Sequence, residues 1–275
     1  MTAPRDESAE REARRLGQAW EQRAQSPARD FFVASHPGWD DPATWEAQAR
    51  HDADFLLQQL RIPLPQAHLL EIGCGVGRLA AVLAPRVASY TGFDIAPSMV
   101  AEARARHRSG NTRFFEADGL SVPAGARDRN YHLALAHAVF IHCPREVIAT
   151  LIADAWTLLA DGGELRFQLR ADPEDEAPLL HLDPEPGAPA ASPAAADRAH
   201  DDARAAAGQE LEGRAAVPTS QVSLVEERDY MGATFRSEAV LPFLQGLPGV
   251  AGARISAARV DRLHIYAALR RPVPD

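Results

Sequence analysis

The sequence predicts an α/β fold, in which a doubly wound, mostly parallel sheet carries a helical cap at its N-terminus. Two observations support this prediction. From residue 68 onward, short apolar runs alternate with segments of helical periodicity, as in strands joined by crossover helices. The first of these runs ends at Glu71 and enters a loop with glycine at every second position, as expected where a buried strand turns sharply into a helix.

We divide the chain into four parts. Residues 1–62 are predicted to form the helical cap, because apolar residues recur at helical spacing and Asp41 precedes a proline as an N-cap would. Residues 63–170 form the α/β core, and residues 219–275 complete the sheet. Residues 171–218 are rich in proline, alanine and acidic residues, which predicts a solvated, mobile insertion or a lid over a ligand. Three of the four tryptophans lie in the cap, namely Trp20, Trp39 and Trp45. We expect them either to anchor the cap on the core or to form the roof of a pocket.

The elements of the core are predicted from short apolar runs and from the residues that bound them. Strands are expected at residues 68–72, 89–94, 112–117, 131–136 and 164–169. A helix is expected before the fifth strand, closed by Gly162 and Gly163. Two further apolar runs, at residues 253–258 and 263–269, predict a hairpin at one side of the sheet.

The composition excludes several classes of function. The chain has 275 residues, of which 38 are acidic and 29 basic, giving a formal net charge of -9. All of the basic residues are arginines, so Schiff-base and lysine-nucleophile chemistry is excluded. An acidic balance argues against a nucleic-acid partner. With no long apolar run and no apolar core for a signal peptide at the start of the chain, we expect no membrane association and a cytoplasmic protein. The two cysteines, Cys74 and Cys143, do not have the spacing of a metal site.

The residues that end the strands predict a binding site. In open α/β sheets, ligands lie beyond the carboxyl ends of the strands, near the point where the strand order reverses. Asp94 ends the second strand, 21 residues after Gly73, where a carboxylate accepts hydrogen bonds from ribose hydroxyls. Asp118 follows the third strand and is placed to accept from an exocyclic amine, while Ile95 and Met99 could pack on a purine. Together these residues predict an adenosine site.

A dinucleotide is the obvious alternative ligand. Its glycine fingerprint requires a third glycine at position 78, where this chain has Arg78. The observed spacing is instead glycine at every second position, preceded by Glu71. This difference disfavours an NAD-type oxidoreductase.

Four segments resemble the successive motifs of class I S-adenosylmethionine-dependent methyltransferases. They are EIGCGVGR at 71–78, GFDIAPSM at 92–99, EADG at 116–119 and LADGGEL at 159–165. The resemblance implies a seven-stranded sheet whose last strand is antiparallel, with S-adenosylmethionine as cofactor. It also implies that Gly73 and Gly75 bind the methionine part, Asp94 the ribose and Asp118 the adenine amine. We further expect cofactor contacts from three residues at the same edge: Glu71, Gly119 and Ala136.

The predicted reaction is methyl transfer to an oxygen or nitrogen of a small-molecule acceptor. The chain lacks the Asn-Pro-Pro-Tyr type of motif after the fourth strand, by which amino-group methylases of nucleic-acid bases are recognised. His137 and His142 follow that strand, where a general base for a hydroxyl acceptor is expected, although His142 could instead hydrogen-bond the loop backbone. Because no base is secure, a non-methylating reaction on the same fold, such as a cyclisation, stays an alternative. A non-enzymatic binding module is the least favoured alternative.

Overall fold

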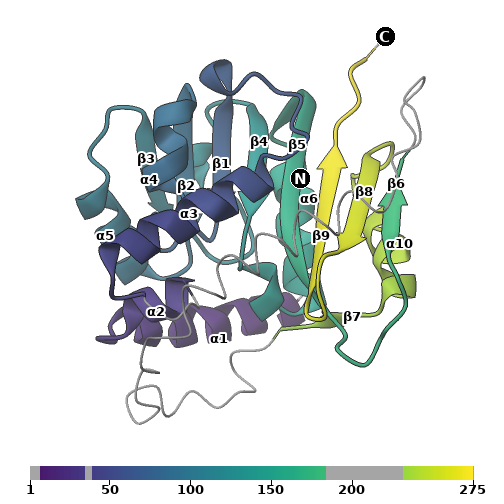
Figure 1. The fold of residues 1–275 in the computed structure, drawn as a ribbon, viewed down its shortest axis with the longest axis horizontal. Coiled ribbons are helices and arrows are strands. Elements are labelled where there is room, and N and C mark those ends of the chain that lie inside the picture. The colour runs from purple at the N-terminus through teal and green to yellow at the C-terminus, as the bar shows by residue number, and fades with distance from the viewer. Residues whose placement is uncertain (1–6, 35–38, 184–231, 275) are drawn as a thin grey trace.

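The protein is a single mixed sheet with helices on both faces. The computed structural model describes residues 7–34, 39–183 and 232–274. In this part of the chain the sheet has nine strands, in the order β3-β2-β1-β4-β5-β9-β8-β6, and β7 pairs with β5 (Figure 1). The strands are β1 (His68–Ile72), β2 (Ser89–Asp94), β3 (Thr112–Glu116), β4 (Tyr131–Ala136), β5 (Leu159–Ala171), β6 (Leu180–Leu182), β7 (Thr234–Phe235), β8 (Arg254–Arg259) and β9 (His264–Arg270).

Helices cover both faces of the sheet and one of its ends. The α-helices are α1 (Glu7–Ala24), α2 (Arg29–Ala34), α3 (Pro42–Leu56), α4 (Ala80–Leu83), α5 (Pro97–Arg106), α6 (Arg145–Trp156) and α10 (Ser237–Gln245). Buried side chains of α3, α4 and α5 form one core cluster with β1 and β4, while α6 and α10 contribute to a second. Helices α1 and α2 run across the carboxyl ends of the parallel strands, at the bottom of Figure 1.

The strand pairing creates the position for a site. β1 pairs in parallel with β2 on one side and with β4 on the other. The chain therefore reverses its direction of progress through the sheet between β1 and β4, which is where open α/β sheets bind ligands. β2 is buried at every position, as expected for a central parallel strand, whereas β9 alternates between buried and partly exposed residues.

The expected doubly wound sheet with an antiparallel last strand is confirmed. The predicted hairpin forms from β8 and β9, and β9 is antiparallel to β5. The two strands beyond the expected seven, β6 and β7, are only three and two residues long. The cap also begins its third helix as expected, since the Asp41 carboxylate accepts a hydrogen bond of 2.9 Å from the Thr44 amide.

The predicted end of α6 is wrong. The helix ends at Trp156, and Gly162 and Gly163 lie within β5, which begins at Leu159. The pairing of β4 with β5 shifts register in this region, so the chain forms an irregular strand there. A Cβ atom on Gly163 would come within 2.8 Å of the Ala160 carbonyl oxygen, which explains why this irregularity needs glycine.

The sheet extends into the first part of the expected insertion. β6 pairs with β8 in an antiparallel ladder. The Asp175 carboxylate accepts a hydrogen bond from the Ser237 amide at the start of α10. Residues 184–218, and the ordered segment expected at residues 221–226, lie outside the described residues. None of the described helices combines the length and the apolar character that a membrane crossing requires.

Gly92 in β2 provides a test of the core. An added Cβ would lie 2.8 Å from the Cys74 Cβ and 3.0 Å from the Phe114 ring. We expect Gly92→Ala to lower the free energy of unfolding by about 1–3 kcal/mol, because the overpacked side chains must shift. Gly110→Ala is the matched control, since its Cβ would meet no atom within 4 Å. Urea denaturation of both variants measures the difference, and equal midpoints would contradict the packing described.

Candidate active site

The loop after β1 is locked to the end of β2. Gly73 and Gly75 have positive φ angles of 68° and 52°, a conformation that glycine adopts without strain. The amides of Gly73 and Cys74 both donate to the Phe93 carbonyl oxygen, at 2.8 and 3.0 Å. The Gly75 amide donates to Asp94 Oδ2 at 2.8 Å. The backbone of this loop is therefore presented in one fixed shape.

Asp94 joins this loop to the start of α5. Its second carboxylate oxygen accepts a hydrogen bond of 2.9 Å from the Ala96 amide, one residue before the helix begins. Burial raises the pKa of Asp94, and the bonds from Ala96 and Gly75 partly offset that effect. A carboxylate has about four lone-pair sites, so two bonds leave acceptor capacity for hydroxyl groups. Asp94 fixes the residue that precedes α5 and can also bind a ribose.

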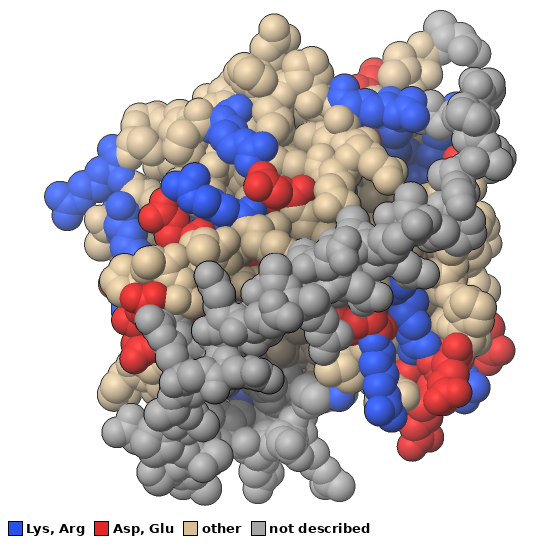
Figure 2. All heavy atoms as spheres, in the orientation of Figure 1, with Lys and Arg blue, Asp and Glu red and all other residues tan. Residues whose placement is uncertain are grey.

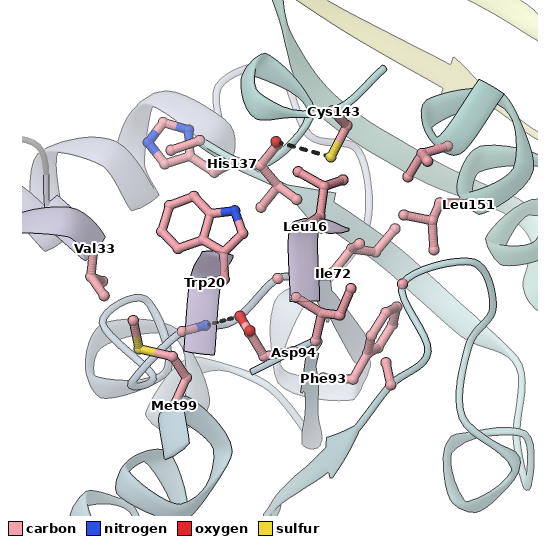
Figure 3. Close-up of a pocket in the computed structure, with 18 of the residues that line it drawn as sticks. Leu16, Trp20, Val33, Ile72, Phe93, Asp94, Met99, His137, Cys143 and Leu151 are labelled. Carbon is pink, nitrogen blue, oxygen red and sulfur yellow. Dashed lines mark hydrogen bonds between the residues drawn. The ribbon is translucent and has the colours of Figure 1, made fainter. Parts of the chain in front are cut away.

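A cavity of about 810 Å³, including the part open to solvent, lies at the carboxyl ends of the strands. The side chains from β1, β2 and the following loops meet side chains from α1, α2 and α6 there (Figure 3). The lining residues from α1 and α2 are Leu16, Trp20, Phe32 and Val33. The predicted site residues on its wall are Gly73, Gly75, Asp94, Ile95, Met99, Gly119 and His137. Trp20, one of the three cap tryptophans, therefore forms part of the roof of this cavity.

Polar contacts fix the cap over this cavity. The Glu21 carboxylate of α1 accepts a hydrogen bond of 3.0 Å from the Ser98 amide and another from the Ser98 hydroxyl. In α2, Asp30 forms an ion pair of 2.9 Å with Arg106 of α5. Both contacts join the roof to α5, whose start Asp94 fixes through the Ala96 amide, so the roof and the floor of the cavity share one support.

The chain turns sharply after β4, at His137 and Ala138. Ala138 has a φ of 57°, which is strained for a residue with a Cβ atom. Its amide donates to the buried Gln168 side chain at 3.1 Å, a bond that holds the strained turn. As a result, His137, Ala138 and Val139 all line the cavity.

His137 is linked to the cap through Asp52 of α3. The His137 Nε2 lies 3.4 Å from Asp52 Oδ2, and the same oxygen lies 2.7 Å from Arg78 Nη1. On the other side of the ring, the Tyr266 hydroxyl lies 3.3 Å from Nδ1. Burial alone would raise the pKa of Asp52, but hydrogen bonds from His137 and His51 and the charge of Arg78 lower it well below its usual range. Asp52 is therefore an anion whose side chain is only 12% exposed.

His142 is placed differently from His137. Its side chain is buried, and its ring lies edge-on to Trp20 with a centroid distance of 5.2 Å. It is not among the described residues that line the cavity. The neighbouring Cys143 does line it, but burial raises the pKa of this thiol to about 12, so it is not a nucleophile.

Three other predicted cofactor ligands lie beside the cavity. Glu71 is buried and accepts a hydrogen bond from the Tyr90 hydroxyl. Asp118 is exposed, and its carboxylate accepts hydrogen bonds from the amides of Leu120 and Ser121. Ala136 is fully buried in β4. Among the described residues the cavity wall includes none of the three, so direct contacts from them remain predictions.

Comparison with known proteins agrees with the resemblance of the motifs. The sequence model of the methyltransferase domain matches residues 69–163, which include the glycine loop, Asp94 and His137. This part of the chain is therefore similar to S-adenosylmethionine-dependent methyltransferases. The trans-aconitate 2-methyltransferase of Streptomyces avermitilis is 32% identical over 148 residues, which cover 50% of this chain and 52% of that protein. The chain thus spans about half the length of this relative.

Solved structures with bound S-adenosylhomocysteine have a similar fold. A complex of DhpI with S-adenosylhomocysteine has a TM-score of 0.54 and 19% identity, covering 96% of this chain and 98% of the other. The phosphoethanolamine N-methyltransferase 1 of Haemonchus contortus, in complex with phosphoethanolamine and S-adenosylhomocysteine, has a TM-score of 0.59 and 14% identity. It covers 96% of this chain and 50% of that enzyme.

The cavity fits S-adenosylmethionine, the cofactor that the motifs imply. Gly73 and Gly75 expose bare backbone to the cavity, and the Asp94 carboxylate faces the same space (Figure 3). The apolar side chains of Ile95 and Met99 lie beside them on the wall. Within the described ranges, no group of three or more His, Cys, Asp or Glu residues could hold a metal ion.

Sequence reasoning did not identify Asp52 or Tyr266 as parts of this methyltransferase site. The sequence did carry a signal for Asp52. This residue lies on the same face of α3 as the buried residues Ala49, Ala53 and Leu56. An acidic residue on an apolar stripe requires a buried partner. Tyr266 lies on the partly exposed face of β9 and has no comparable signal.

Glu71 gives the site a pH-dependent stability. Burial raises the pKa of Glu71 to about 8, and Arg78 opposes this shift. The folded protein keeps this proton up to about pH 8, whereas the unfolded chain loses it near 4.5. The contribution of Glu71 to stability is therefore lost as the pH rises from 4.5 to 8. Between pH 4.5 and 8, we expect the free energy of unfolding to fall by about 1–3 kcal/mol less in Glu71→Gln than in the parent protein.

Denaturant unfolding at pH 5 and pH 8 measures this effect. Glu116→Gln, at an exposed carboxylate, is the control and should leave the decline unchanged. The same pH dependence in the Glu71 variant as in the parent protein would show that Glu71 is ionised in the folded state.

Proposed function

We propose that the protein transfers the methyl group of S-adenosylmethionine to an oxygen or nitrogen of a small, largely apolar acceptor. The observation that carries this proposal is the shared cavity. It places the glycine loop and Asp94 beside His137 and a roof of apolar side chains from α1 and α2. Donor and acceptor can therefore meet in one space that the cap partly covers.

The residues of the site have separate tasks in this proposal. The backbone at Gly73 and Gly75 contacts the methionine part, Asp94 accepts hydrogen bonds from the ribose, and Ile95 and Met99 pack on the adenine. S-adenosylmethionine supplies a methyl group on a sulfonium that is already an activated leaving group. The protein contributes mainly by positioning, which can lower the barrier by about 7–11 kcal/mol.

Charge and similarity support a small acceptor rather than a nucleic acid. The net charge is -9, and basic and acidic side chains are interspersed on the face shown in Figure 2. A nucleic-acid methylase needs a clustered basic surface. Names among the similar proteins refer to small molecules, namely trans-aconitate and ubiquinone biosynthesis.

The cavity wall supports an acceptor without strong negative charge. Its described ionisable side chains are Asp94, His137 and Cys143, and none of its described residues is an arginine. A carboxylate-rich acceptor would lack a cationic partner on this wall. Leu16, Trp20 and Phe32 instead provide apolar surface for a ring or an alkyl chain.

Asp94 tests the cofactor site. We expect S-adenosylhomocysteine to bind with micromolar affinity, and Asp94→Ala to weaken binding about 10- to 100-fold, because hydrogen bonds to a charged group contribute about 1.5–3 kcal/mol. Isothermal titration calorimetry measures both affinities. Asp128→Ala is the control, since that carboxylate lies on the surface between Arg113 and Arg129. Unchanged affinity in the Asp94 variant, with native circular dichroism, would contradict the site.

The reaction is tested with a panel of acceptors. The parent protein is incubated with S-adenosylmethionine and simple phenols, alcohols, amines and trans-aconitate, and the products are measured by mass spectrometry. We expect a methylated phenol, alcohol or amine and an equal amount of S-adenosylhomocysteine. Products of unchanged mass would indicate a rearrangement, and preferential methylation of trans-aconitate would contradict an apolar acceptor.

A further inference from the structure

The contacts around His137 determine which of its ring nitrogens carries a proton. Asp52 is a mostly buried anion and can only accept, so Nε2, which faces it at 3.4 Å, must carry hydrogen. Burial, reinforced by the charge of Asp52, raises the pKa of the Tyr266 hydroxyl, which therefore keeps its proton. That hydroxyl can donate to Nδ1 only if Nδ1 has a free lone pair. Both partners select the same tautomer.

This arrangement is built by elements that are far apart in the sequence. Asp52 comes from α3, His137 from the end of β4 and Tyr266 from β9. The Phe55 ring packs edge-on against Tyr266 with a centroid distance of 4.5 Å and fixes its orientation. The Asp52 carboxylate is further bound by the Gln48 side chain at 2.9 Å. A carboxylate this extensively constrained can orient the imidazole.

We propose that Asp52 is a positioning residue for methyl transfer, which holds His137 with Nε2–H toward its carboxylate and leaves Nδ1 as the base for an acceptor hydroxyl. This inference rests on the proposed function and specifies a hydroxyl as the acceptor group. Tyr266 occupies Nδ1 through a single bond of 3.3 Å, longer than the usual hydroxyl bond. An acceptor hydroxyl entering the cavity replaces Tyr266 at that nitrogen.

The proposed step balances as follows. The acceptor hydroxyl gives its proton to His137 Nδ1 as its oxygen forms a bond to the methyl carbon. The bond between that carbon and the sulfonium breaks, and its electron pair stays on sulfur, giving neutral S-adenosylhomocysteine. The imidazolium that forms is stabilised by the charge of Asp52, and it later releases its proton to solvent.

Several charged groups surround His137 besides Asp52. Arg78 contacts Asp52 at 2.7 Å and reduces the negative charge that His137 experiences, and His51 lies 3.5 Å from the other carboxylate oxygen. Tyr266 is neutral, and Asp94 lines the same cavity. Asp52 is the anion in direct contact, so its removal should dominate the change at His137.

Asp52→Asn tests the positioning role by NMR, independently of any acceptor. In the full-length protein saturated with S-adenosylhomocysteine, ¹⁵N shifts of the His137 ring should show the Nε2–H tautomer. In the variant, the share of this tautomer should fall, because the anion that faces Nε2 is lost. Asp54→Asn is the matched control on the same helix, since Asp54 is exposed and pairs with Arg86 at 2.9 Å. An unchanged tautomer in the Asp52 variant would overturn the proposal.

Kinetics with a methylated member of the acceptor panel test the chemical step. We expect Asp52→Asn to lower kcat/KM about 10- to 100-fold, within the range of general base catalysis, and to move the acidic limb of its pH profile to lower pH. Tyr266→Phe should retain kcat, because the acceptor replaces that hydroxyl. A purely structural Asp52 would lower the unfolding midpoint and leave the limb in place, which would overturn the proposal. No methyl transfer by the parent protein would instead contradict the proposed function, while the NMR result would still decide the positioning role.

Discussion

The hydrogen bond between the Gly75 amide and the Asp94 carboxylate is the contact on which the site depends. It joins the loop after β1 to the end of β2, and the second oxygen of Asp94 fixes the start of α5 through the Ala96 amide. Helix α5 in turn supports the roof, because Ser98 and Arg106 bind the cap helices α1 and α2. One buried carboxylate thus aligns the glycine loop, the helix and the cap, and it still has lone pairs for a ribose.

A second buried carboxylate organises the opposite wall. Asp52 lies between Arg78, which follows the glycine loop, and His137, which ends β4. A buried anion is costly unless it is paired and hydrogen-bonded, and Asp52 has partners from three different segments. The contacts that offset the cost of burying Asp52 also set the orientation of His137, the only histidine on the described cavity wall. Stability and the proposed catalytic geometry share these interactions.

The parts of the fold that the sequence predicted are those governed by local patterns. β1, β2 and β4 have the expected bounds, because short apolar runs ended by an acid, a glycine or a turn leave little freedom in where a strand begins. The antiparallel direction of β9 followed from the resemblance to a family. The end of α6 and the start of β5 could not be predicted from such patterns. Leu159 suits either a helix or a strand, and its pairing with Tyr131 of β4 decided between them.

For the site, the sequence by itself determined the groups that follow each strand: the glycine loop, Asp94 and the His137 turn. They converge because the carboxyl ends of parallel strands meet at one edge, which is a consequence of topology alone. Only the tertiary structure decided which side chains point into the cavity and what each one contacts. Trp20 forms part of the roof, Glu71 turns to Tyr90, and His137 rather than His142 faces the ligand space. The partners of His137 come from α3 and β9, and contacts between segments so distant in the chain depend on packing that no local pattern records.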